Sequence, residues 1–136
     1  MIVVLDTNVV VSGLLRPHSK PATVLRLVAI GAVCVAYDER ILAEYREVLG
    51  RPKFPFSPAQ IKTFLDQIEG EGVAVAAPPL TNRLLDPDDA AFLEVAVAAR
   101  VQALITGNAR HYPVRCRHGI AVVDPAAFLN SWRKQR

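Results

Sequence analysis

Residues 2–8 read IVVLDTN, and this stretch holds the feature that decides the fold. The apolar run 2–5 has no polar residues alternating within it, which is typical of a strand buried on both faces. A carboxylate, Asp6, follows this strand directly, and Thr7 and Asn8 come next. Ligands of open parallel sheets bind beyond the carboxyl ends of the strands, so Asp6 is a candidate site residue. The alternative is that Asp6 forms a turn with Thr7 and Asn8.

Apolar strands and amphipathic helical segments alternate along the rest of the chain. Strands are expected at residues 2–5, 32–37, 73–76, 103–106 and 120–123. Helices are expected at residues 8–15, 22–31, 38–49, 59–70, 86–100 and 124–136. Loops are expected at residues 16–21, 50–58 and 78–85, with a turn or short helix at 107–112. Strands covered on both faces predict a three-layer α/β/α sandwich with a mostly parallel central sheet of about five strands.

Length and composition favour one domain over residues 1–136. The chain has 136 residues, of which 51% are hydrophobic, enough for one sizeable core. No apolar run approaches the ~18 residues of a membrane helix, and the start has no signal-peptide pattern. We therefore expect a cytoplasmic protein without a membrane partner. Cys34 is expected in the core and Cys116 in a loop, without a disulfide or a zinc-site pattern.

The net charge of +3 permits a polyanionic partner without requiring one. Basic residues gather after the first predicted helix and again in the segment 110–118. Arg16, Arg110 and His111 are the candidates for contact with a phosphodiester backbone. The alternative for each of them is an ordinary solvated surface residue.

Two acids on predicted helices can reach the same sheet edge as Asp6. Asp89 shares a helical face with the apolar Leu93, and Glu44 lies one turn before Val48 at the border of an apolar face. A carboxylate that borders a core is costly unless it is paired or bound to a metal. Several carboxylates at one edge repel each other, and Mg²⁺ or Mn²⁺ would relieve that repulsion.

Other polar residues flank these acids. Asp86 is the expected N-cap of the helix that carries Asp89, with Pro87 at its first position. Asn108 follows the predicted strand 103–106, so its amide oxygen is a further candidate ligand at that edge.

Four stretches resemble successive blocks of the PIN domain family, most closely its VapC-like branch of bacterial toxin–antitoxin toxins. They are VVLDTNVVVSGLL at 3–15, LAEYREVLGRPKF at 42–54, DPDDAAFLEVAVA at 86–98 and ALITGNARHYP at 103–113. The resemblance implies an α/β/α fold and metal-dependent endoribonuclease activity. It also implies a homodimer and a small antitoxin protein that blocks the site.

Carried over by position, the resemblance implies that Asp6, Glu44 and Asp89 are the first three family acids and hold Mg²⁺ or Mn²⁺. The fourth family acid usually stands where this chain has Asn108, which can offer an oxygen ligand but no charge. We therefore count Asn108 with the three acids as a catalytic candidate. The residues expected to support them are Thr7, Asn8, Asp86 and Thr106.

These observations predict an enzyme that cleaves RNA phosphodiesters with metal-activated water. No histidine or tyrosine stands in a clear general-base position in the sequence. The first alternative is a PIN-like module that binds RNA or a protein partner without cutting, because Asn108 interrupts the acid set. The second is a metal-dependent phosphatase, which often carries another aspartate two residues after the first; Asn8 at that position argues against it. No glycine-rich phosphate loop follows any predicted strand.

Overall fold

A computed structural model of the chain describes residues 1–81 and 85–135. It contains one five-stranded sheet with the strand order β3-β2-β1-β4-β5, and every neighbouring pair is parallel. The strands are β1 (Ile2–Leu5), β2 (Cys34–Tyr37), β3 (Val73–Ala74), β4 (Ala103–Ile105) and β5 (Val122–Val123). The predicted parallel sheet is confirmed. The expected strand 73–76 is shorter than predicted, because its ladder covers only Val73 and Ala74.

Helices connect the strands. They are α1 (Thr7–Leu15), α2 (Lys20–Ala29), α3 (Glu39–Leu49), α4 (Pro58–Glu71), α5 (Pro87–Ala99) and α6 (Pro125–Lys134), with short 3₁₀ turns η1 (Ala109–His111) and η2 (Val114–Cys116). Side chains cap several helix starts as the sequence predicts: Asp38 and Asp86 each accept a backbone N–H. Helix α2 begins inside the expected loop 16–21, because Ser19 caps it and accepts from Ala22 N.

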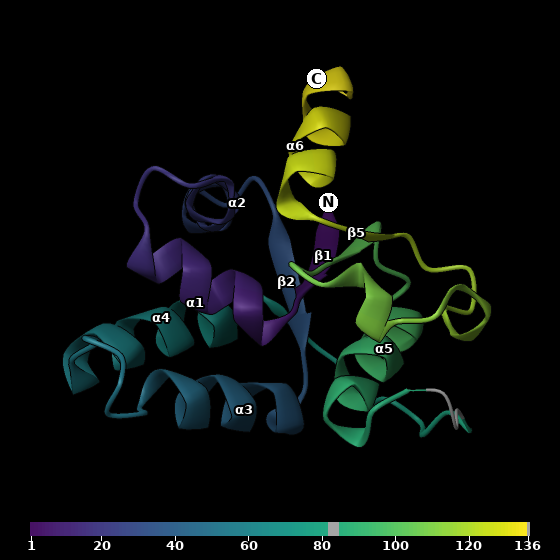
Figure 1. Cartoon of the computed structure of the whole chain (residues 1–136), viewed down its shortest axis with the longest axis horizontal. Coiled ribbons are helices and arrows are strands. Elements are labelled where there is room, and N and C mark those ends of the chain that lie inside the picture. Colours follow the sequence, from purple (N-terminus) through teal and green to yellow (C-terminus); the bar gives the residue numbers. More distant parts are fainter. Residues whose placement is uncertain (82–84, 136) are drawn as a thin grey trace.

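The helices lie on both sides of the sheet. Figure 1 shows α1, α2 and α4 on one side of β1 and β2, and α5 on the other. Helix α5 returns the chain from edge strand β3 to β4 and packs against β1, β2 and β4. The strand order places β1 in the centre, between β2 and β4. The carboxyl end of β1, where Asp6 stands, therefore has the ends of two other strands beside it.

The core confirms the interpretation of residues 2–5 as a buried strand, since Val3, Val4 and Leu5 have no exposed surface. Tyr45 of α3 is equally buried, and its hydroxyl donates to Leu5 O at 2.5 Å. Two expectations were wrong. Cys34 is only partly buried because it begins its strand, and Cys116 is buried in η2 instead of lying in an open loop.

Residues 82–84 and 136 lie outside the described residues. They belong to the predicted loop 78–85 and to the end of the predicted helix 124–136. Within residues 1–81 and 85–135, none of the helices is long and apolar enough to cross a membrane.

Candidate functional site

Asp6 lies between the end of β1 and the start of α1. Its backbone N–H continues the sheet ladder by donating to Ile105 O at 2.9 Å, and the residue is 5% exposed. Its Oδ2 atom accepts two hydrogen bonds, from Thr106 Oγ1 at 2.9 Å and from the Tyr112 hydroxyl at 3.1 Å. The carboxylate does not cap α1. Asp6 is therefore a buried, oriented carboxylate, and the alternative of a turn former does not describe its side chain.

Glu44, on α3, contacts the residue that follows Asp6. The side chain is half-buried, and Thr7 Oγ1, at the start of α1, donates a hydrogen bond to Glu44 Oε2. Burial raises the pKa of the Glu44 carboxyl, the bond from Thr7 partly opposes this, and the negative charge of Asp6 raises the pKa further. The electrostatic effect of Asp6 shows that the two acids share one neighbourhood, although they come from different elements.

Asp89 approaches from the first turn of α5. Its side chain is 15% exposed. Burial, followed by the charge of Asp6, raises the pKa of Asp89 from 3.8 to about 6, while His111 opposes the rise. His111 Nδ1 lies 3.9 Å from Asp89 Oδ2. Asp89 therefore stands in a region of excess negative charge that one exposed imidazole only partly offsets.

The loop after β4 holds the remaining polar residues close together. Thr106 is fully buried, and its Oγ1 accepts from Asn108 N at 3.1 Å and from Asn8 Nδ2 at 3.4 Å. Asn8 Oδ1 accepts from Gly107 N at 2.8 Å, which joins α1 to this loop. The Asn108 side-chain nitrogen lies 2.9 Å from His111 Nε2. Asn108 thus positions His111, because its side-chain amide contacts that ring.

The other candidates are placed differently. Asp86 caps α5 by accepting from Asp88 N at 2.9 Å, so its observed role is structural. Arg16 is exposed at the far end of α1 from Asp6, about 13 Å along a helix of this length. Arg110 is exposed in η1, next to His111. The structure therefore places Arg110 beside His111 in the chain and Arg16 at the opposite end of α1 from Asp6.

Sequence reasoning missed Tyr112 and Glu94. Tyr112 is fully buried, and burial with the charge of Asp6 raises the pKa of its hydroxyl, which therefore stays protonated and acts as a donor to Asp6. Glu94 of α5 is buried and binds Arg40 of α3 at 2.6 Å and Leu80 N at 2.9 Å. The Tyr112 contact joins residues 106 positions apart, so no local sequence pattern could have indicated it.

The donor set has the chemistry of a hard-cation site, but the side chains are not arranged as a finished one. The charge of Asp6 raises the pKa of Glu44 and of Asp89, and the charge of Glu44 raises that of Asp89, so the three carboxylates lie in one region. Their oxygen atoms are donors that suit Mg²⁺ or Mn²⁺. Within residues 1–81 and 85–135, no group of three or more His, Cys, Asp or Glu side chains has the spacing to hold a metal ion. The residue types therefore fit a divalent cation, and in this arrangement Glu44 Oε2 accepts a hydrogen bond from Thr7.

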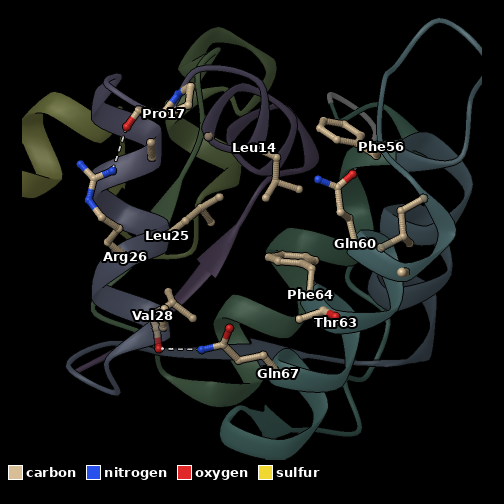
Figure 2. A pocket seen from close by; sticks show the side chains of 15 residues that line it. Leu14, Pro17, Leu25, Arg26, Val28, Phe56, Gln60, Thr63, Phe64 and Gln67 are labelled. Carbon is tan, nitrogen blue, oxygen red and sulfur yellow. Dashed lines mark hydrogen bonds between the residues drawn. The ribbon is translucent and has the colours of Figure 1, made fainter.

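A second feature is an apolar groove of about 610 Å³ between α2 and α4, which begins beside the carboxyl end of α1. Figure 2 shows Leu14, Leu25, Val28 and Phe64 around it. Leu14 is 37% exposed, which is high for a large apolar side chain. The groove contains none of the three acids. It is a separate surface, and its apolar lining suits a protein segment better than a polyanion.

The parallel sheet and its helices on both faces define a PIN-like α/β sandwich, with Asp6 at the end of its central strand. The chain belongs to the PIN domain family, whose model matches residues 2–110. This match confirms the resemblance inferred from the four sequence blocks.

Solved structures support the same fold. A chain in the crystal structure of VapBC2 from Rickettsia felis, bound to a DNA fragment from their promoter, is similar with a TM-score of 0.59 and 17% sequence identity. The match covers 91% of this chain and 98% of that chain. No curated protein matches the sequence significantly.

Proposed function

We propose that this PIN domain protein is a metal-dependent endoribonuclease and the toxin of a toxin–antitoxin pair. The observation that carries the proposal is the electrostatic coupling of three acids from different elements: the charge of Asp6 raises the pKa of both Glu44 and Asp89, and the charge of Glu44 raises that of Asp89. The raised pKa of Asp89, to about 6, records how strongly burial and the neighbouring acids disfavour its charge. Holding these charges together without a cation costs folding free energy. A role in function therefore explains the arrangement better than a role in stability.

Asp6, Glu44 and Asp89 are the residues that would hold Mg²⁺ or Mn²⁺. When bound, the metal supplies a Lewis acid for the scissile phosphate and lowers the pKa of a coordinated water. Thr106 and Tyr112 keep the Asp6 carboxylate in one orientation by donating to the same oxygen. Such hydrogen bonds to a ligand commonly determine metal affinity.

Residues around the acids would receive the RNA. His111 is exposed and lies beside Asp89, which places its ring where a phosphate oxygen could accept a hydrogen bond. Asn108 contacts the other ring nitrogen and so restricts the orientation of the imidazole. Arg110, exposed on the adjacent turn, would attract the backbone electrostatically.

The proposal includes protein partners. The similar chain comes from a structure named as VapBC2, and we propose a VapB-like antitoxin for this protein. The apolar groove between α2 and α4 offers such a partner about 610 Å³ of recess lined by side chains such as Leu14 and Phe64. We further propose a homodimer that acts in the cytoplasm.

A second candidate function is RNA or partner binding without cleavage. The observation in its favour is Asn108, which occupies the place of the fourth family acid and leaves the site with one charge fewer. A site that does not cleave RNA could still contact a phosphate group through His111.

Incubation of the purified protein with a mixed RNA pool separates the two functions. We expect internal cleavage with Mn²⁺ or Mg²⁺, none with EDTA, and none from an Asp6→Asn variant that keeps the native circular dichroism spectrum. RNA retained on the protein but left uncut at every metal concentration would support the binding module and overturn the nuclease.

A further inference from the structure

A cleft of about 640 Å³ with both polar and apolar walls opens next to His111, on the side of α1 and the loop after β4. Its volume lies in the range of ~300–1,000 Å³ that is usual for small-ligand sites. The walls come from α1, the start of α2, the segment after β4 and the start of α6. The polar side chains that line it are Asn8, Ser12, Lys20, Asn108, His111 and Asp124.

This cleft adjoins the acid site at His111. His111 lines it and also lies 3.9 Å from Asp89 Oδ2. Asn8 lines it too, and its bond to Gly107 N at 2.8 Å fixes the boundary between α1 and the loop after β4. A polymer whose scissile phosphate lies at Asp6 and Asp89 would therefore place a neighbouring residue in this cleft.

Lys20 gives the cleft a cation with no structural partner in the described part of the chain. It is exposed, and no ion pair or hydrogen bond of its ammonium group is found among residues 1–81 and 85–135. It also stands at the first position of α2, where the helix dipole disfavours a positive charge. Lys20 therefore costs the fold a little and is free to bind an anion.

Asp124 gives the cleft a hydrogen-bond acceptor. Its Oδ1 accepts from Ala127 N at 2.7 Å and caps α6, whereas no partner of Oδ2 is found in the described part. Lys20 and Asp124 both line the cleft, yet they form no ion pair within 4.0 Å. A carboxylate oxygen accepts hydrogen bonds from base amino groups and repels phosphate, whereas an ammonium group attracts phosphate, so Asp124 and Lys20 suit different parts of one nucleotide.

We propose that this cleft is a subsite for the nucleotide next to the cut, with its phosphate at Lys20 and its base at Asp124. The inference rests on the proposed ribonuclease function and adds to it the element that selects where the RNA is cut. Lys20 supplies affinity for RNA that does not depend on the RNA sequence. Asp124 supplies a preference for a base with an amino group on its exposed edge.

The test compares Lys20→Gln with Lys62→Gln, an exposed lysine of α4 outside the cleft. We expect Lys20→Gln to raise KM for single-stranded RNA about five- to twentyfold with kcat nearly unchanged, and to lower the salt dependence of binding by about one phosphate contact. Lys62→Gln should leave KM, kcat and the salt dependence as in the original protein. Binding to the uncut RNA, measured by fluorescence anisotropy on an Asp6→Asn background, should show the same loss for Lys20→Gln.

A second variant tests the base contact. Asp124→Asn keeps the cap of α6, because asparagine is as good an N-cap as aspartate. Sequencing the ends of a cleaved random RNA pool should show one enriched base beside the cut, and this preference should change or vanish in Asp124→Asn.

The outcomes separate the two levels of the proposal. If the original protein cleaves no RNA with any divalent metal, the proposed function fails first. If it cleaves RNA, but Lys20→Gln matches Lys62→Gln and Asp124→Asn leaves the cut-site preference unchanged, the subsite is wrong and the nuclease stands.

Discussion

Replacing Asp89 by asparagine should stabilise the metal-free protein while abolishing its activity. In the folded chain the pKa of Asp89 is raised from 3.8 to about 6 by burial and by the charge of Asp6. The folded state therefore holds more protons than the unfolded state between these two values, and stability falls as the pH rises through that window. Above pH 6 the full penalty of the charged carboxylate is present, and Asp89→Asn removes it.

The size of the effect follows from the pKa shift. A rise of about 2 pH units corresponds to ~3 kcal/mol at ~1.4 kcal/mol per unit, which is an upper limit because the side chain and its surroundings relax. We expect Asp89→Asn to raise the free energy of unfolding at pH 7.5 by about 1–3 kcal/mol in EDTA. Near pH 3.5 the carboxyl is protonated in the folded state and mostly protonated in the unfolded state, so little of the penalty remains and the two proteins should have similar stability.

Urea unfolding in EDTA at several pH values measures this difference. Asp88→Asn is the matched control: Asp88 is the exposed neighbour in the same helical turn, and its loss should change stability by at most ~0.5 kcal/mol through the helix dipole. Saturating Mn²⁺ should stabilise the original protein and not Asp89→Asn. A variant that is less stable than the original protein at pH 7.5 without metal would refute the reasoning, because it would show that the Asp89 charge is compensated in the fold.

Four further outcomes follow from the contacts described above. Tyr112→Phe removes one of two donors to Asp6 and should weaken Mn²⁺ binding about tenfold by calorimetry; unchanged affinity would mean that Thr106 alone orients Asp6. Arg40→Ala leaves Glu94 buried without its cation and should cost about 1–3 kcal/mol in urea unfolding, whereas no loss would show that Leu80 N suffices. Asn108→Asp adds a charge near the acids and should strengthen Mn²⁺ binding about five- to tenfold, a net gain of ~1 kcal/mol; equal or weaker binding would make the contact of Asn108 with His111 the important one. Light scattering at concentrations of tens of micromolar, on the order of usual assays, should show a dimer, and a monomer would contradict that proposal.

The periodic parts of the chain were predictable from the sequence. The run 2–5 is apolar without alternation, which is the pattern of a strand buried on both faces of a parallel sheet. The sequence therefore predicted a buried position for this strand. Asp89 and Glu44 could be assigned to helix faces that border the core because the helical repeat fixes which residues share a face. The neighbouring positions of β1, β2 and β4 then brought the three acids to one region, as the pKa shifts of Glu44 and Asp89 record.

The contacts between distant segments were not predictable. Tyr112 follows a 3₁₀ turn with no repeat, so nothing in its neighbourhood shows that its hydroxyl reaches Asp6. Glu94 stands among apolar residues of α5, and its cation, Arg40, lies 54 positions earlier. The cleft beside the acids likewise brings Lys20 and Asp124 together only after the sheet has formed.

The most direct measurement is the rate of RNA cleavage by Asp89→Asn and Asp88→Asn, each purified free of contaminating nuclease and assayed with Mn²⁺. The two residues are adjacent carboxylates in the first turn of α5, and Asp89 is the one whose pKa is raised by burial and by the charge of Asp6. Our account predicts a loss of at least ~100-fold for Asp89→Asn and a rate within about twofold of the original for Asp88→Asn. Because Asp89→Asn should be the more stable protein, unfolding could not explain its loss. Equal, undiminished cleavage by both variants would contradict the assignment of this sheet edge as a metal-dependent nuclease site.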